Sequence, residues 1–125
     1  MAAAGVPILV VEDDPRIREI IRWALEDEGY AVTTAADGRQ ALERAAAAPP
    51  ALVVLDMMLP ILDGPAVAAG LRAAPRPMPP IVLVTADGRA AEKAARVGAF
   101  AYLHKPFDLD DLIAVVRRGL ARAGG

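Results

Sequence analysis

The sequence predicts an α/β fold in which helices cover both faces of a parallel β-sheet. Short aliphatic runs alternate with longer stretches that carry apolar residues at helical spacing, which is the pattern of repeated β–α units. The aliphatic runs show little alternation of apolar and polar residues, as is typical of strands that are buried on both faces. Proline, glycine and aspartate separate the segments, and we expect right-handed crossovers between the strands.

The first β–α unit has the clearest boundaries, and the later units repeat its pattern. Four aliphatic residues at 8–11 form the expected strand, Asp14 and Pro15 are suited to a helix N-cap and first position, and Gly29 is suited to end the helix. In chain order, the expected strands are residues 8–11, 31–34, 51–55, 81–84 and 100–103. The expected helices are residues 15–28, 38–48, 65–73, 89–97 and 108–122. Further breaks are expected at Asp63, Asp87 and Gly98, and Asp108 is suited to cap the last helix.

Length and composition limit the possible functions. One α/β domain of 125 residues can bury a proper core and accounts for residues 1–125. The net charge of −2 and the lack of a basic face argue against direct nucleic-acid binding. The chain has no cysteine and one histidine, His104, which excludes disulfides, thiolate chemistry and a histidine metal cluster. The sequence has no membrane-spanning run and no secretion signal, so we expect no membrane partner and a cytoplasmic location.

Polar residues gather where the expected strands end. Glu12 and Asp13 follow the first strand and Asp56 follows the third. Thr85 follows the fourth strand and Lys105 the fifth. In an open parallel sheet these positions share the carboxyl edge, where ligands bind. Carboxylates placed close together repel one another, which raises their pKa values, so a bound cation is needed to offset the cost.

This set of side chains indicates phosphoryl transfer. Carboxylate oxygens are suited to Mg²⁺, with Asp56 and the acids after the first strand as ligands. Lys105 and Thr85 then face a position suited to a phosphoryl group, together with the backbone N–H groups of Met57 and Ala86. Only Lys93 and Lys105 are lysines among the 14 basic residues, which indicates that the compact ammonium group is needed here. A metal ion, a carboxylate and an ammonium group are together the groups that phosphoryl transfer uses.

Simpler structural roles explain part of the same set. Asp14 is more readily a helix cap than a ligand, and Thr85 is able to satisfy a backbone group at a strand end. Glu12 and Asp13 are acceptable turn residues. An acid at position 56, between the runs LVVL and MMLP, is not explained in this way.

Four motifs, ILVVEDDP, VVLDMMLPILDG, IVLVTA and YLHKPF, occur in this order and together carry a family resemblance. With them the chain resembles the response-regulator receiver domain, the CheY-like phosphoacceptor module of two-component signalling. The resemblance covers essentially the whole chain. It implies a flavodoxin-like (βα)5 three-layer sandwich with a five-stranded sheet of order 2-1-3-4-5.

The resemblance also implies roles for the acids. Asp56 matches the aspartate that accepts a phosphoryl group from a histidine kinase, a phosphotransfer protein or a small phosphodonor. Glu12 and Asp13 match the pair that holds Mg²⁺, with Asp56 and the Met58 backbone carbonyl as further ligands and Glu12 acting through water. The protein is then a self-phosphorylating acceptor rather than a conventional enzyme.

Lys105 matches the lysine that pairs with the phosphoryl oxygens, and its bond to Pro106 resembles one that is cis in the family. Thr85 and Tyr102 match the switch pair, whose rearrangement changes the surface of helix 4, strand 5 and helix 5. That surface controls an output domain or target protein, and we expect a monomer or weak dimer. The kinase is expected to dock on the first helix, which carries Arg16, Arg18, Arg22 and Trp23.

The sequence departs from the family in three places. The segment 85–105 is shorter than usual, so the alanine-rich fourth helix is expected to be short and mobile. Phe100 and Ala101 replace a pair of aspartates that bridges an active dimer in many receivers, which predicts an exposed apolar surface instead. Met58 and Asp87 occupy positions that tune the access of water to the phosphoryl group.

Two other functions fit part of the pattern. A receiver-like interaction module that works without phosphorylation would keep the same fold. A Mg²⁺-dependent phosphatase with an aspartyl-phosphate intermediate would use Asp56, but haloacid dehalogenase phosphatases carry a second aspartate where this chain has Met58. The final residues ARAGG resemble the start of a linker, which favours a piece of a larger regulator over a stand-alone receiver.

Overall fold

The strands form one parallel sheet with the order β2-β1-β3-β4-β5, as the family resemblance implied. The computed structural model describes residues 5–124. Residues 1–4 and Gly125 lie outside the described residues, and with them most of the N-terminal segment and the end of the ARAGG run. The observed strands are β1 (Pro7–Val11), β2 (Ala31–Ala35), β3 (Leu52–Asp56), β4 (Ile81–Thr85) and β5 (Ala101–His104).

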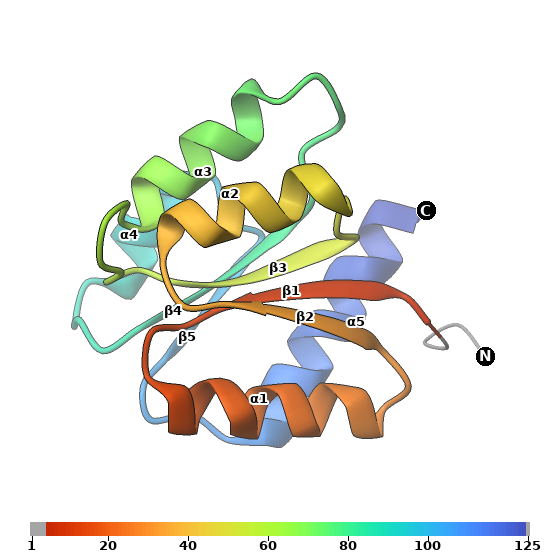
Figure 1. Ribbon diagram of the computed structural model, residues 1–125. Coiled ribbons are helices and arrows are strands. Elements are labelled where there is room, and N and C mark those ends of the chain that lie inside the picture. Colours follow the sequence, from red (N-terminus) through yellow and green to blue (C-terminus); the bar gives the residue numbers. More distant parts are fainter. Residues whose placement is uncertain (1–4, 125) are drawn as a thin grey trace.

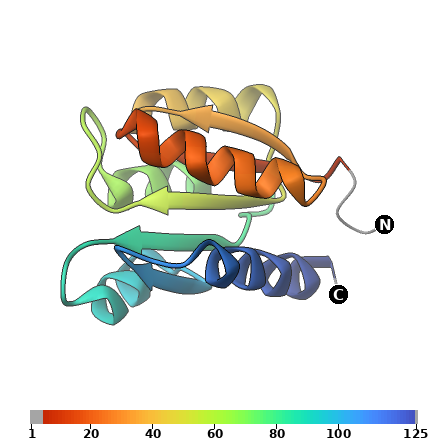
Figure 2. The same ribbon diagram turned by 90° about the horizontal axis from the view of Figure 1, so that it is seen from below.

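Helices cover both faces of this sheet. The helices α1 (Pro15–Asp27) and α5 (Leu109–Gly124) lie on one face, and α2 (Gly38–Ala47), α3 (Gly64–Ala73) and α4 (Ala90–Val97) lie on the other (Figures 1 and 2). All predicted elements are confirmed, with boundaries that differ by a residue or two, as is normal at frayed ends. Within the described part of the chain, no helix is long and apolar enough to cross a membrane.

The core consists of two apolar layers, one on each face of the sheet. Leu9, Val53 and Leu83 point toward α2, α3 and α4, whereas Val10 and Val54 point toward α1 and α5. The central strands β3 and β4 are buried along their whole length. The edge strands β2 and β5 alternate between more and less exposed residues, so the expectation that every strand is covered on both faces is wrong at the two edges.

The helix ends explain why α1 and α4 differ. The carboxylate of Asp14 accepts hydrogen bonds from the backbone of Arg16 and Ile17 at the start of α1. The N-cap of α4 is Arg89, and no side chain in the described residues caps that helix. Gly98 ends α4 in the left-handed conformation, with φ of 71°, which glycine adopts at little cost. At eight residues, α4 is short, as predicted.

Candidate functional site

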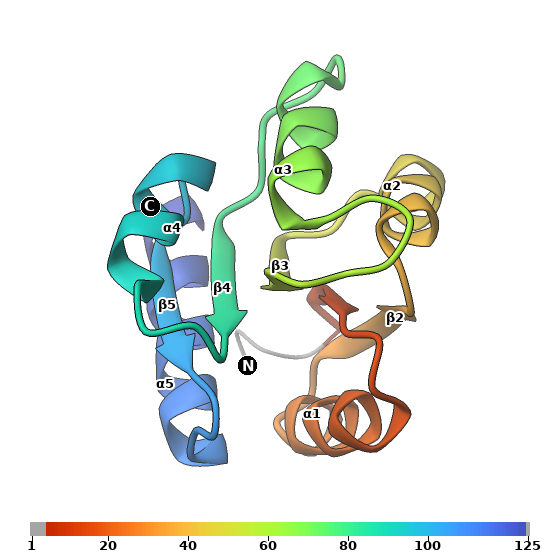
Figure 3. The ribbon, with the colours of Figure 1, turned by 90° about the vertical axis from the view of Figure 1, so that its left-hand side faces the viewer.

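The site lies at the carboxyl edge of the sheet, which Figure 3 views end-on. Glu12 and Asp13 lie in the β1–α1 loop, and Asp56 is the last residue of β3. Thr85 is the last residue of β4, and Lys105 directly follows β5. Because all five strands are parallel, these ends meet at one edge. The structure therefore brings together the residues that the sequence singled out.

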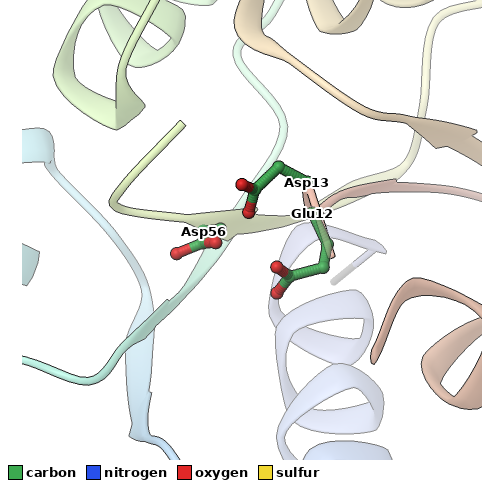
Figure 4. Close-up of side chains that lie close together, drawn as sticks. All are labelled: Glu12, Asp13 and Asp56. Atoms are coloured by element: carbon green, nitrogen blue, oxygen red, sulfur yellow. The ribbon is translucent and has the colours of Figure 1, made fainter. Parts of the chain in front are cut away.

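Three carboxylates converge at the centre of this edge. One carboxylate oxygen from each of Glu12, Asp13 and Asp56 lies within 4.8 Å of the other two. The close-up in Figure 4 shows the three side chains together. Glu12 is 2% exposed and Asp56 is 5% exposed, whereas Asp13 lies at the surface. Hard carboxylate oxygens with one side open to solvent are a donor set suited to a hydrated Mg²⁺ ion.

Lys105 holds the two buried acids together. Its Nζ atom lies 2.9 Å from Oε1 of Glu12 and 3.3 Å from Oδ2 of Asp56. Burial would by itself lower the pKa of Lys105, but the hydrogen bond to Glu12 and the charges of Asp56 and Glu12 outweigh it, and the pKa is raised. The ammonium group therefore stays charged at the centre of the site.

Glu12 has the most perturbed carboxyl group of the site. Burial raises its pKa from 4.5 to about 7, Asp56 adds to the rise, and the hydrogen bond from Lys105 opposes it. The backbone N–H of Asp14 also donates to Oε2 of Glu12 at 3.2 Å. A cation bound beside Glu12 would favour the ionised form and oppose this burial cost.

The backbone donor beside Asp56 is not the predicted one. The N–H of Met57 extends the β3–β4 ladder by donating to the Val84 carbonyl at 3.0 Å, so it is already used. The N–H of Met58 instead donates to Oδ1 of Asp56 at 3.2 Å. The Met57 N–H is therefore not free to contact a phosphoryl group as expected, because the strand pairing continues one residue past Asp56.

The two predicted switch residues lie on β4 and β5. Thr85 is fully buried, and its Oγ1 accepts a hydrogen bond from the Asp87 N–H at 3.0 Å, so the predicted local backbone role is present. Tyr102 is 46% exposed and is therefore in an outward position. The Lys105–Pro106 peptide bond is cis, as predicted.

The loop before α4 contains a contact that the sequence did not reveal. The carboxylate of Asp87 accepts hydrogen bonds from the Arg89 N–H at 2.8 Å and from Lys93 Nζ at 2.5 Å. The Lys93 hydrogen bond is the largest cause of the lowered pKa of Asp87; the Arg89 N–H and the nearby charges also lower it, whereas burial opposes the shift. Asp87 thus connects the Thr85 hydroxyl to α4.

Two expected surfaces differ from the prediction. Phe100 and Ala101 are half-buried against the apolar layer beneath α1 and α5, and the Arg122 guanidinium lies 5.3 Å from the centre of the Phe100 ring. The predicted exposed apolar surface at these two residues is therefore wrong. The Phe100 N–H donates to the Ile81 carbonyl at 2.8 Å, and Ala101 begins β5 opposite Val82.

Two of the three arginines of α1, Arg18 and Arg22, are engaged in contacts within the chain. Arg22 forms ion pairs with Glu19 and Glu26, and the Arg18 side chain turns to the β1–α1 loop. The exposed apolar side chains of this helix are Ile20, at 49%, and Trp23, at 69%. They border apolar hollows that continue to Phe107 and Leu109.

A five-stranded sheet of order 2-1-3-4-5, with a lysine beside an acid cluster at its carboxyl edge, places the chain in the class of flavodoxin-like, CheY-type α/β domains. The sequence matches the family described as the response regulator receiver domain over residues 8–117. The chain belongs to this family, and its function is that of a receiver domain of two-component response regulators.

Relatives and solved structures agree with this assignment. The chain is 44% identical over 123 residues to the transcriptional regulatory protein TcrA of Mycobacterium tuberculosis, covering 97% of this chain and 48% of TcrA. It is 44% identical to the response regulator MprA of Mycolicibacterium vanbaalenii, covering 94% of this chain and 51% of MprA. The chain thus spans about half the length of these relatives.

Two solved structures have the same fold. The chemotaxis response regulator CheY4 of Vibrio cholerae superposes with a TM-score of 0.86 at 32% identity, over 94% of this chain and all of CheY4. The receiver domain of the sensor histidine kinase PA1611 of Pseudomonas aeruginosa has a TM-score of 0.85 at 34% identity, over 94% of this chain and 99% of that domain. The PA1611 domain was solved with a magnesium ion coordinated in its active-site cleft.

Proposed function

We propose that Asp56 accepts a phosphoryl group in a Mg²⁺-dependent reaction. The observation that carries this proposal is the approach of three carboxylates to within 4.8 Å, with the Lys105 ammonium between Glu12 and Asp56. A purely structural role would leave unexplained why a buried strand ends in an acid next to another buried acid. The family assignment supports the same function.

Glu12, Asp13 and Asp56 would hold the metal ion, with the Met58 carbonyl as a further ligand. Their hard oxygen atoms fit Mg²⁺, and the exposure of Asp13 leaves room for bound water. When bound, the ion supplies positive charge that offsets the repulsion between the acids and the incoming phosphoryl group.

In the transfer step, one Asp56 oxygen forms a bond to phosphorus. The bond from phosphorus to the donor breaks at the same centre, and the donor leaves with the bonding electron pair as the imidazole of a phosphohistidine or as acetate from acetyl phosphate. Lys105 moves its contact from the free carboxylate to the phosphoryl oxygens, and the N–H groups of Met58 and Ala86 donate to them.

Phosphorylation then acts on Thr85. Its hydroxyl turns to the phosphoryl group and releases the Asp87 N–H, and Tyr102 moves inward into the space that opens. The changed surface of α4, β5 and α5 controls an output domain or a target protein. The protein promotes its own phosphorylation but is not a conventional enzyme.

The proposed phosphodonor partner is a sensor histidine kinase or a phosphotransfer protein. Exposed Ile20 lines the apolar hollow that reaches Lys105, and exposed Trp23 lines a second hollow with Ile20; both favour docking on α1 through apolar contact more than through arginine charge. We further propose that residues 1–125 form one receiver domain that works in the cytoplasm as a monomer or weak dimer, without direct contact to nucleic acid or membrane.

Intact-mass spectrometry after incubation with acetyl phosphate tests the acceptor role. We expect one phosphoryl adduct that requires Mg²⁺ and is absent from the Asp56→Asn variant. An adduct that persists in Asp56→Asn places the reaction elsewhere. No adduct with acetyl phosphate or with a phosphorylated kinase, in protein that binds Mg²⁺, would favour the phosphorylation-independent interaction module.

A further inference from the structure

Arg18 lies on α1 but makes its contacts with the loop that carries the acidic pair. Its Nη1 atom donates to the carbonyl oxygen of Glu12 at 2.9 Å and lies 3.4 Å from that of Asp13. The side chain is half-buried, as expected for a group that is held in place. One guanidinium nitrogen thus approaches two consecutive peptide groups of the loop.

The other bonds of this loop leave Asp13 as its least fixed acid. The Glu12 N–H donates to the Ala35 carbonyl, and the Asp14 N–H donates to the Glu12 side chain. Asp14 is further held as the N-cap of α1. Asp13 lies at the surface between them, and the Arg18 contacts restrain the peptide planes on either side of it.

The position of Arg18 is not explained by the helix itself. A cation in the first turns of a helix opposes the positive end of the helix dipole, so the local electrostatics disfavour arginine there. Hydrogen bonds to two carbonyl oxygens offset that cost. The positive charge of Arg18 also lies next to the loop that brings the Glu12 and Asp13 carboxylates close to that of Asp56.

We infer that Arg18 is a positioning residue for the metal site: it holds the β1–α1 loop so that the Glu12 and Asp13 carboxylates are arranged to bind Mg²⁺. The inference rests on the proposed function and assigns Arg18 to the metal-binding loop rather than to the kinase-docking surface. Groups that orient metal ligands from outside the coordination shell affect metal affinity by about 10- to 100-fold.

The test compares Arg18→Met with Arg16→Met. Both variants remove one positive charge from the same part of α1, but the Arg16 side chain is 91% exposed and reaches only Asp14, at 3.9 Å. Mg²⁺ is titrated by calorimetry into metal-free protein, and the rate of phosphorylation by acetyl phosphate is measured against Mg²⁺ concentration. Circular dichroism verifies the fold of each variant.

We expect Arg18→Met to weaken Mg²⁺ binding about tenfold relative to the wild type, with Arg16→Met within about twofold. At saturating Mg²⁺ the rate with acetyl phosphate should recover to within about twofold of the wild type, because only the site's arrangement was lost. Arg18→Lys, which keeps the charge and one donor group, should lie between the wild type and Arg18→Met.

Equal Mg²⁺ affinity in Arg18→Met and Arg16→Met would overturn the inference and leave the proposed function intact. A defect in Arg18→Met that appears only with a kinase donor would return Arg18 to the docking surface. If Arg18→Met does not fold, wild-type Mg²⁺ affinity in Arg18→Lys and in Arg18→Gln overturns the inference. Wild-type protein that binds no Mg²⁺ would refute the proposed function itself, and this inference with it.

Discussion

The carboxyl edge of the sheet has two halves that are built differently. The acid half consists of the β1–α1 loop, α1 and the end of β3, and the switch half consists of the β4–α4 loop, α4 and β5. Helix α1 has 13 residues and an aspartate cap, and it buries Ile21 and Leu25. Helix α4 has eight residues, its buried side chains are Ala90, Ala94 and Val97, and no described side chain caps it.

This difference supports the proposed division into a fixed metal site and a movable surface. Groups that bind a metal must keep their arrangement, and the acid half keeps it with large buried side chains and several hydrogen bonds to the loop. A segment that changes position in response to a signal must be displaced at a small free-energy cost. Small buried side chains with few attachments keep that cost low. The Asp87–Lys93 contact and the Arg72 hydrogen bond to the Val97 carbonyl are identified attachments of α4.

The largest expected effect contrasts the anchors of the two helices. Leu25→Ala should lower the free energy of unfolding by about 3 kcal/mol, because a fully buried leucine leaves a cavity. Val97→Ala removes less apolar volume and should cost about 1.5 kcal/mol. Urea unfolding measures both values. Equal losses of stability in the two variants would mean that α4 is anchored as firmly as α1, which would contradict the proposed difference between the two halves.

The pH dependence of stability sharpens the description of the acid half. The native pKa of Glu12, about 7, lies above its ordinary value of 4.5, so the native state holds this proton more firmly than the unfolded chain. In EDTA, the stability of the wild type should therefore fall relative to Glu12→Gln as the pH rises from 4.5 to 7. A constant difference between the two proteins over this range contradicts the burial of Glu12.

Ile61 is a strained exception within the loop that follows Asp56. It has φ of 71°, which is unfavourable for a β-branched residue, and its side chain is 72% exposed. Ile61→Asn should raise the free energy of unfolding by about 1 kcal/mol, because asparagine tolerates this conformation and little burial is lost. Met58→Asn, at a nearby exposed position without positive φ, is the control and should not stabilise the protein.

The smallest global effect is expected at Lys93. Its partner Asp87 is partly exposed, so Lys93→Met should change the free energy of unfolding by less than about 1 kcal/mol. Amide hydrogen exchange in α4 should nevertheless become faster, because one of its attachments is lost. Arg96→Met, at an exposed position of the same helix, serves as the control. Unchanged exchange in α4 would show that the Asp87–Lys93 pair does not restrain it.

The sequence predicted the elements and the residues that gather at the site for a physical reason, whereas the strand order came from the family resemblance. Acids such as Asp56 interrupt apolar runs, and the ends of parallel strands must share one edge, so their proximity follows from topology. Hydrogen bonds of long side chains could not be predicted, because Arg18 and Lys93 have the same local pattern as solvated surface residues. Phe100 packs against the apolar layer just before β5 begins, and the Met57 N–H is used by strand pairing one residue past Asp56; local sequence reveals neither.

Hydrogen exchange measured residue by residue, with and without Mg²⁺ and excess acetyl phosphate, tests the comparison most directly. We expect phosphorylation to change amide hydrogen exchange in the β4–α4 loop, α4 and β5. In contrast, α1 beyond its first turn and β1 should keep their protection. In phosphorylated Thr85→Ala, the change in α4 and β5 should be lost while the adduct on Asp56 remains. Changes spread evenly over both halves, or confined to α1, would contradict the division into a fixed site and a movable surface.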